Sequence, residues 1–160
     1  HGDTFKVPKA TLSKTSAKIM SLNDASKKMS KSESADSYIG MDEEPDVIIK
    51  KFKRAVTDSD NKIRFGKDKP EISNLLTIFS EFADKPVNEI EKDYEGKGYG
   101  QFKSDLGDIV SDKLKELQRT FNEIRNDELR LNNIITEGNR NAGTMANEKI
   151  SIVKEILGLV

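Results

Sequence analysis

The chain has 160 residues, of which 34% are hydrophobic and 34% charged, and its formal net charge is −1. It has no cysteine, no histidine besides His1, and no apolar run approaching the roughly 18 residues that a membrane helix needs. These absences exclude a disulfide framework, a thiolate metal site, internal histidine catalysis and a transmembrane span, so we expect a soluble, cytoplasmic protein of globular composition.

The charge is unevenly distributed along the chain. Residues 1–70 carry 15 Lys and Arg against 11 Asp and Glu, whereas residues 71–160 carry 12 against 17. Between Lys6 and Lys31 there are seven lysines and one acid, Asp24. A polyanion such as a phosphate group or an RNA backbone would therefore meet the first part of the chain.

The first 41 residues predict loops around one short strand. Residues 6–16 are polar and contain Pro8, which favours a loop, and residues 17–22 alternate enough to predict a strand with Ile19 and Met20 at a buried sheet end. Residues 23–37 then predict a second loop.

Helical periodicity begins near Asp42. Pro45 and its acidic neighbours are typical of a helix start, and an apolar stripe continues to about Val56, before a turn at residues 57–61. Apolar positions spaced by three and four residues then predict helices from about 70 to 83, 86 to 94, 102 to 124 and 127 to 157. The last helix is expected to loosen between Gly138 and Gly143. The fold is therefore predicted to be mainly α, with a helical bundle from residue 42 onward.

The last helix carries more apolar residues than one buried face requires. These residues are Ile150, Ile152, Val153, Ile156 and Leu157. We expect a contiguous apolar patch to be exposed at this end of the chain and near residues 19–22, and we expect the chain by itself to self-associate.

The pentapeptide Lys28-Met29-Ser30-Lys31-Ser32 carries the clearest chemical signal. It places two lysines three residues apart, among small hydroxyl side chains and without a β-branched or aromatic residue. A mobile loop with two cationic tips suits a triphosphate whose departing pyrophosphate gains charge in the transition state. Taken alone, such a run is also common on solvated surfaces.

Together with this pentapeptide, further segments of the chain resemble a known family. Residues 28–32 resemble the KMSKS lysine loop of class I aminoacyl-tRNA synthetases, and residues 19–24 before it resemble the tryptophanyl-tRNA synthetase branch. Residues 51–59, 72–76 and 94–103 resemble later segments of the same family, in the same order. The sequence as a whole is similar to the C-terminal part of bacterial-type tryptophanyl-tRNA synthetases.

The resemblance implies a function for the whole enzyme. Such an enzyme activates tryptophan with ATP and Mg²⁺, releases pyrophosphate and transfers the amino acid to its tRNA; it is expected to be a homodimer. Lys28 and Lys31 are implied as catalytic, with Lys31 contacting the transition state. The implied ATP-binding residues are Ile19, Lys28, Met29, Ser30, Lys31 and Ser32. No protein ligand to a metal is implied.

The resemblance also implies a division of the chain. Residues 1–41 would be the remnant of a Rossmann-like α/β nucleotide-binding domain, and residues 42–160 a helical anticodon-binding domain. The last helix of that domain would pack back on the missing nucleotide-binding half. The amino-acid pocket and the rest of the nucleotide-binding half would lie upstream, so the chain alone is expected to be inactive.

The loop departs from the usual family pattern. Many relatives have Asp-Pro-Thr before the two lysines and Asp-Pro after the last serine, whereas this chain has Asp24-Ala25-Ser26 and Glu33-Ser34. The loss of proline relaxes φ and should make the free loop more mobile.

Other readings of the sequence stay open. The glycine-rich residues 96–100 follow a predicted helix rather than a strand, which favours a connector with a packed Tyr99 over a phosphate loop. The basic residues 50–54 suit either a tRNA contact or a solvated helix face. For the whole chain, the alternatives are a tyrosyl-tRNA synthetase fragment and a non-enzymatic helical RNA-binding or interaction module.

Overall fold

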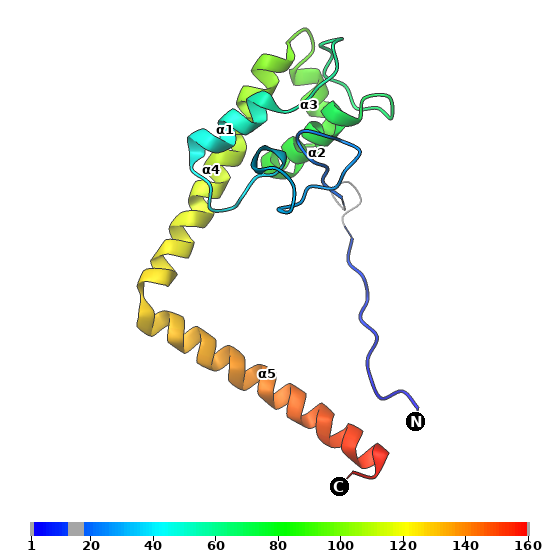
Figure 1. The fold of residues 1–160 in the computed structure, drawn as a ribbon, viewed down its shortest axis with the longest axis vertical. Coiled ribbons are helices and arrows are strands. Elements are labelled where there is room, and N and C mark those ends of the chain that lie inside the picture. Colours follow the sequence, from blue (N-terminus) through cyan, green and yellow to red (C-terminus); the bar gives the residue numbers. More distant parts are fainter. Residues whose placement is uncertain (1, 13–17, 160) are drawn as a thin grey trace. The chain divides into compact units, whose positions relative to one another are not determined.

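The computed structural model describes residues 2–12 and 18–159. It is mainly helical, as predicted (Figure 1). The helices are η1 (Ala35–Ser37), a single 3₁₀ turn, followed by α1 (Pro45–Arg54), α2 (Pro70–Ala83), α3 (Val87–Asp93), α4 (Tyr99–Asn126) and α5 (Glu128–Leu157). No helix among the described residues is both long enough and apolar enough to cross a membrane.

The chain divides into two compact units. The large unit comprises Leu12–Arg119, and the small unit comprises His1–Thr11 with Thr120–Val160. The predicted boundary between residues 41 and 42 concerns the division of the whole protein and stays a prediction.

Local sequence accounts for the helix boundaries of the large unit. Pro45 and Pro70 occupy the first positions of α1 and α2, where proline's fixed φ suits a helix and its missing N–H costs nothing. α1 begins with an acidic turn and ends with a basic one, which complements the helix dipole. α2 ends at Asp84, whose φ of 49° lies in the left-handed region.

The core of the large unit is built mainly from α1, α2 and the first part of α4. α2 contributes the longest run of buried side chains, from Ile72 to Phe79. Phe79, Tyr94 and Phe102 form an aromatic cluster, with ring centroids 5.1 to 5.7 Å apart, that joins α2, the end of α3 and α4.

α4 packs closely against α1 at Gly107. A Cβ atom added there would lie 3.0 Å from the Cα atom of Ile49 in α1. Glycine at this position lets the two backbones pack closer than any other residue would allow.

The small unit is dominated by α5. Asp127 caps this helix by accepting a hydrogen bond from the amide of Arg130 (2.9 Å), and Gly158 ends it with a φ of 67°. No described residue of α5 is buried, and Ile150, Ile152, Ile156 and Leu157 are all exposed, as the surplus of apolar residues predicted. The exposed patch predicted near residues 19–22 is not observed, because Leu22 is buried and Ile19 packs against the core of the large unit.

The prediction that the last helix loosens between its two glycines is wrong. α5 is continuous through Gly138 and Gly143. Each glycine costs only about 1 kcal/mol relative to alanine. That cost does not outweigh the helical propensity of the flanking residues in so long a helix.

The predicted strand at residues 17–22 is also not observed in the part that the structure describes, residues 18–22. Met20 instead forms a single antiparallel bridge with Lys28. The backbone N–H and C=O of Met20 that face away from Lys28 bond to a side chain of α2. They therefore have no neighbouring strand as a partner. The Rossmann-like remnant and the anticodon-binding bundle stay predictions.

Candidate functional site: the lysine loop

The lysine loop, residues 19–37, begins with a short antiparallel pairing. The amide of Met29 donates to the carbonyl of Ile19 (3.0 Å), and the amide of Ser21 donates to the carbonyl of Lys27 (2.9 Å). These bonds flank the bridge between Met20 and Lys28. The first catalytic lysine implied by the sequence therefore lies on a hydrogen-bonded base rather than on a free coil.

The turn that precedes the lysines is organised by Asp24. One of its carboxylate oxygens accepts from the hydroxyl (2.6 Å) and the amide (3.0 Å) of Ser26, and its carbonyl accepts from the amide of Lys27 (3.1 Å). The bonds from Ser26 lower the pKa of the Asp24 carboxyl, so Asp24 is ionised at neutral pH. The two bonds from Ser26 thus stabilise this turn.

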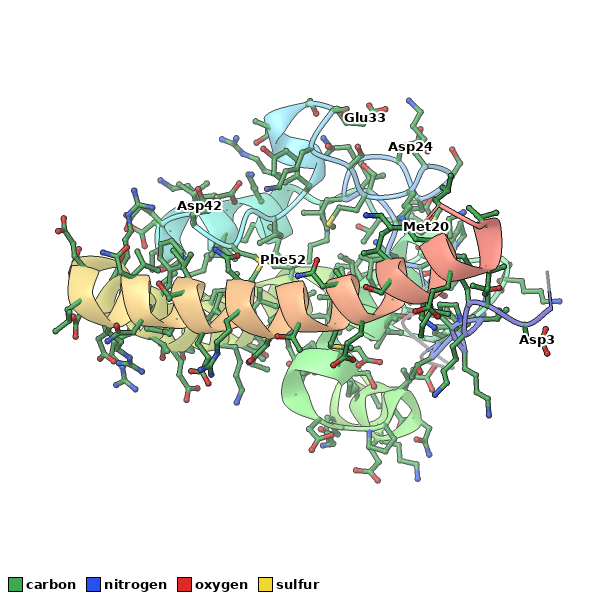
Figure 2. The ribbon with its side chains drawn as sticks, turned by 90° about the horizontal axis from the view of Figure 1, so that it is seen from below. Asp3, Met20, Asp24, Glu33, Asp42 and Phe52 are labelled. Carbon is green, nitrogen blue, oxygen red and sulfur yellow. The ribbon has the colours of Figure 1, made fainter. Side chains whose placement is uncertain are left out.

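The three neighbouring lysines differ in what they contact. Lys27 lies 3.8 Å from a carboxylate oxygen of Asp24 and 4.0 Å from one of Glu33. Lys28 and Lys31 are exposed and make no ion pair with any described residue. Figure 2 shows Asp24 and Glu33 at the rim of the loop, with Met20 and Phe52 closer to the helices. The loop therefore satisfies one ammonium internally and leaves the other two for an anion.

Met29 and Ser30 fix the segment between the two exposed lysines. The half-buried Met29 packs against the hydrophobic core, as predicted, and with Ile19 and Phe52 it lines an apolar cavity of about 360 Å³. The hydroxyl oxygen of Ser30 accepts from the amide of Ser32 (3.2 Å). Its hydrogen remains available to donate to a ligand.

Three hydrogen bonds attach the base of the loop to the helical region, and a fourth closes the loop on itself. Both backbone groups of Met20 bond to the side-chain amide of Asn74 on α2, at 2.8 and 2.9 Å. The carbonyl of Leu22 accepts from the amide of Val56, after α1 (2.9 Å), and the amide of Leu22 donates to the carbonyl of Ser37 (3.0 Å). Nothing in the sequence pattern pointed to Asn74.

The basic helix α1 contains one lysine with a structural role. Lys51 is buried, forms an ion pair with Glu43, donates to the carbonyl of Tyr38 (3.0 Å) and lies 4.9 Å from the centre of the Tyr38 ring. It therefore holds the C-terminal end of the loop against α1. The exposed cations of this helix are Lys50, Lys53 and Arg54.

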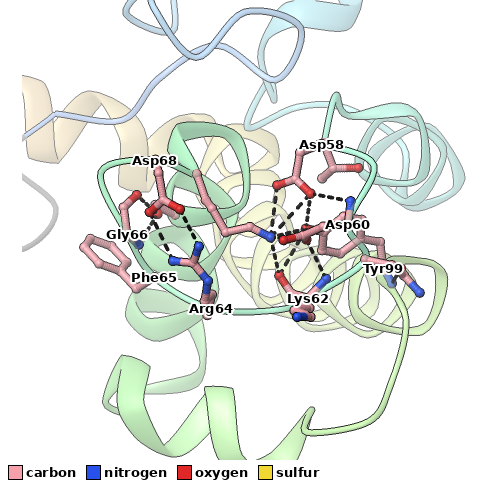
Figure 3. A network of polar contacts seen from close by, with 12 residues as sticks. Asp58, Asp60, Lys62, Arg64, Phe65, Gly66, Asp68 and Tyr99 are labelled. Atoms are coloured by element: carbon pink, nitrogen blue, oxygen red, sulfur yellow. Dashed lines mark hydrogen bonds and ion pairs between the residues drawn. The ribbon is translucent and has the colours of Figure 1, made fainter.

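A second buried lysine, Lys69, organises the turn before α2 (Figure 3). Its ammonium contacts Asp60, lies 3.1 Å from Asp58, and bonds at 2.8 Å to both the hydroxyl of Tyr99 and the carbonyl of Lys62. Burial alone would lower the pKa of Lys69, but its hydrogen bonds to Asp60, Tyr99 and Asp58 outweigh burial and raise it.

The packed Tyr99 predicted for the glycine-rich connector is confirmed. The side chain is buried at the start of α4, and its hydroxyl donates to Asp58 (2.7 Å). Burial is the main cause that raises the pKa of Tyr99, to about 12. The connector therefore has a structural role, through the packing of Tyr99.

A polar groove lies between residues 61–64 and α3 with its following connector. Its volume is about 720 Å³, and it is lined by four exposed cations and two amides: Lys62, Arg64, Lys92, Lys97, Asn61 and Asn88. Glu91 and Glu95 also line it. Phe65, which is 54% exposed, borders a neighbouring hollow that shares Asn88 and Glu91 with the groove.

Comparisons with known proteins agree with the sequence resemblance. A family described as "tRNA synthetases class I (W and Y)" matches residues 1–115. The chain is 42% identical to the tryptophan–tRNA ligase of Bacillus subtilis and 43% identical to that of Bacillus anthracis, over 99% and 98% of its length. It covers 48% of each, so the chain spans about half the length of these relatives.

A solved structure extends this similarity to three dimensions. The crystal structure of tryptophanyl-tRNA synthetase from Mycoplasma pneumoniae superposes with a TM-score of 0.83 at 30% identity, over 92% of this chain and 45% of that one. The expected resemblance is confirmed: this chain belongs to the class I tRNA synthetases of the W and Y family, and within that family it is similar to the tryptophanyl-tRNA synthetases.

Proposed function

We propose that this chain is the C-terminal part of a tryptophan–tRNA ligase and supplies its lysine loop and its tRNA-binding helices. The observation that carries the proposal is the pair of exposed lysines, Lys28 and Lys31, that make no ion pair with any described residue, in a chain 42% identical to such a ligase. Residues 1–41 would complete the Rossmann-like nucleotide-binding domain. Residues 42–160 would form the helical anticodon-binding domain.

In the proposed reaction, a carboxylate oxygen of tryptophan attacks the α-phosphorus of ATP. The bond from the α-phosphorus to the bridging oxygen breaks, and pyrophosphate leaves with that oxygen and its electron pair; Mg²⁺ would help to neutralise the phosphate charge. A ribose hydroxyl of the tRNA then attacks the carbonyl carbon of the adenylate and loses its proton, and AMP leaves with the electron pair of the bond that breaks. Tryptophan would be held by residues outside this chain, so the chain alone would not activate it.

The loop's part in this reaction is electrostatic. Lys31 would stabilise the charge that grows on the departing pyrophosphate, and Lys28 would hold the phosphates from the paired base of the loop. The hydroxyls of Ser30 and Ser32 would donate to phosphate oxygens, while the backbone at Ile19 would border the adenine. Because the lysines are free before ATP binds, no internal ion pair has to break when the loop closes.

The polar groove beside α3 is the surface that best suits the anticodon. Its three lysines can meet phosphates, the side-chain amide of Asn88 can bond to a base edge, and Phe65 can stack on an unpaired base. As a translation enzyme, the complete protein is proposed to work in the cytoplasm as a homodimer.

The test is a reconstituted enzyme, in which this chain replaces the matching half of the Bacillus subtilis ligase. We expect it to catalyse tryptophan-dependent exchange of pyrophosphate into ATP. Lys28→Ala and Lys31→Ala should slow this exchange, whereas Lys53→Ala, which removes an exposed lysine of α1, should not. If both loop variants retain the full rate, the chain is a non-catalytic RNA-binding module and the proposal fails.

A further inference from the structure

Asn74 makes the most specific contact to the lysine loop. It lies in the first half of α2, is 7% exposed, and bonds to a residue 54 positions earlier in the chain. Its Oδ1 accepts from the amide of Met20 (2.8 Å), and its Nδ2 donates to the carbonyl of Met20 (2.9 Å). A single side chain thus satisfies both backbone groups of one loop residue.

Met20 connects Asn74 to the part of the loop that carries the lysines. It forms the bridge with Lys28, and its two neighbours bond to the other side of the loop: Ile19 accepts from Met29, and Ser21 donates to Lys27. The position of Met20 therefore fixes where the second side of the pairing lies. Lys28 is part of that side, and Lys31 follows three residues later.

Only a primary amide provides this contact at this length. It offers one donor and one acceptor, as a neighbouring strand would. An aspartate carboxylate would still accept from the Met20 amide but would face the carbonyl with another acceptor. Alanine would leave both backbone groups without a partner in a mostly buried place, which is unfavourable.

We propose that Asn74 is a positioning residue for the adenylation step, because it holds the base of the lysine loop in the register that places Lys28 and Lys31 on the triphosphate. This inference rests on the proposed function and deepens it. It makes a side chain of the helical region, remote in sequence from the loop, responsible for the loop's catalytic geometry.

The neighbouring Ser73 offers a matched control. Its hydroxyl oxygen accepts from the amide of Gly66 (3.0 Å), and the hydroxyl donates to the carbonyl of Gly66 (3.0 Å). Ser73→Ala therefore removes the same kind of two-bond contact from the same turn of α2. The contact it removes, however, is to the 57–69 connection rather than to the lysine loop.

The kinetic test uses the reconstituted enzyme. Asn74→Asp and Asn74→Ala should lower kcat for pyrophosphate exchange by on the order of tenfold to a hundredfold, the loss expected for one or two buried hydrogen bonds. The KM for ATP should change much less, since the loop acts in the transition state. Ser73→Ala should leave kcat within about twofold, even if it lowers the melting temperature equally.

A double mutant separates positioning from general stability. If Asn74 acts through the loop, Asn74→Ala should slow an enzyme that already carries Lys31→Ala by much less than it slows the parent enzyme. Fully multiplicative losses, or a lower melting temperature with an unchanged kcat, would overturn the positioning role. An unchanged rate in Lys31→Ala would instead overturn the proposed function itself.

A second measurement does not depend on activity. In the 160-residue chain itself, Asn74→Ala should accelerate trypsin cleavage after Lys27, Lys28 and Lys31 several-fold, because the loop base opens more often. Ser73→Ala should leave cleavage at these sites unchanged. Equal cleavage in the parent chain and both variants would show that Asn74 does not hold the loop.

Discussion

The lysines of the loop and the lysines of the helical packing carry the same charge in opposite surroundings. Lys51 and Lys69 are 5% and 2% exposed, and each ammonium contacts at least one carboxylate and one backbone carbonyl. Lys28 and Lys31 are exposed and unpaired among the described residues. The comparison shows that the lysines of one chain can have two roles, stabilising the fold or binding a ligand. The contacts that each ammonium makes determine which role it has.

The largest expected effect separates activity from stability. In the reconstituted enzyme, Lys31→Ala should slow adenylate formation about a hundredfold, since a preorganised charge of this kind contributes roughly 3 kcal/mol in the transition state. Thermal unfolding should show the same melting temperature as the parent, because no described residue loses a partner. If Lys31→Ala lowered both the rate of adenylate formation and the melting temperature, the loop lysines and the buried lysines would not differ in role.

Lys69→Met should do the reverse and destabilise the fold. Removing the ammonium leaves Asp58 and Asp60 facing each other around Tyr99, and we expect a loss of about 2–3 kcal/mol in the free energy of unfolding by urea. This is below the full value for a buried pair, because Asp60 is 46% exposed and water screens it. Lys67→Met, at an exposed position two residues away, should change stability by less than about 0.5 kcal/mol.

The same network should give the fold an acid-sensitive contribution. The bond from Lys69, followed by that from the amide of Lys62, holds the pKa of the Asp60 carboxyl well below its ordinary value of 3.8. The stabilisation is therefore fully present above pH 3.8 and is lost as the pH falls toward the lower folded-state pKa. Asp60→Asn should flatten urea stability against pH below 4; an unaltered slope would show that Asp60 does not contribute.

Lys27→Ala should have the smallest effect. Its two contacts, to Asp24 and Glu33, are long and largely exposed, and water screens such pairs so that they contribute little. We expect the exchange rate to change by less than about fivefold, and the difference from the parent to shrink at high salt. A loss as large as that of Lys31→Ala would place Lys27 among the phosphate ligands.

The helices could be predicted because their signals are local. Prolines at positions 45 and 70, the apolar spacing and the capping Asp127 lie within the segments that they shape. The packing of Met29 and Tyr99 was predicted too, since each is an apolar or aromatic residue in a polar stretch. The strand was predicted wrongly because its alternation does not reveal which partner takes the backbone groups.

The contacts that hold the site could not be predicted, because they join residues far apart in the sequence. Asn74 lies in a run of buried residues of α2, and only the fold brings it to Met20. The difference between Lys27 and its neighbour Lys28 likewise depends on where the chain places Glu33. The roles of Lys28 and Lys31 came from the family resemblance and stay predictions.

Gly107 limits which residues this position of the chain can accept. A Cβ there would meet the Cα of Ile49 at 3.0 Å, so any other residue must move the backbone of α1 by a few tenths of an ångström. Every single-base change that replaces a glycine introduces a Cβ, so no point mutation of this codon offers a smaller or equal residue. In a pool of random variants selected for function, we expect codon 107 to keep only synonymous changes, while codon 100, whose added Cβ meets nothing within 4 Å, accepts alanine.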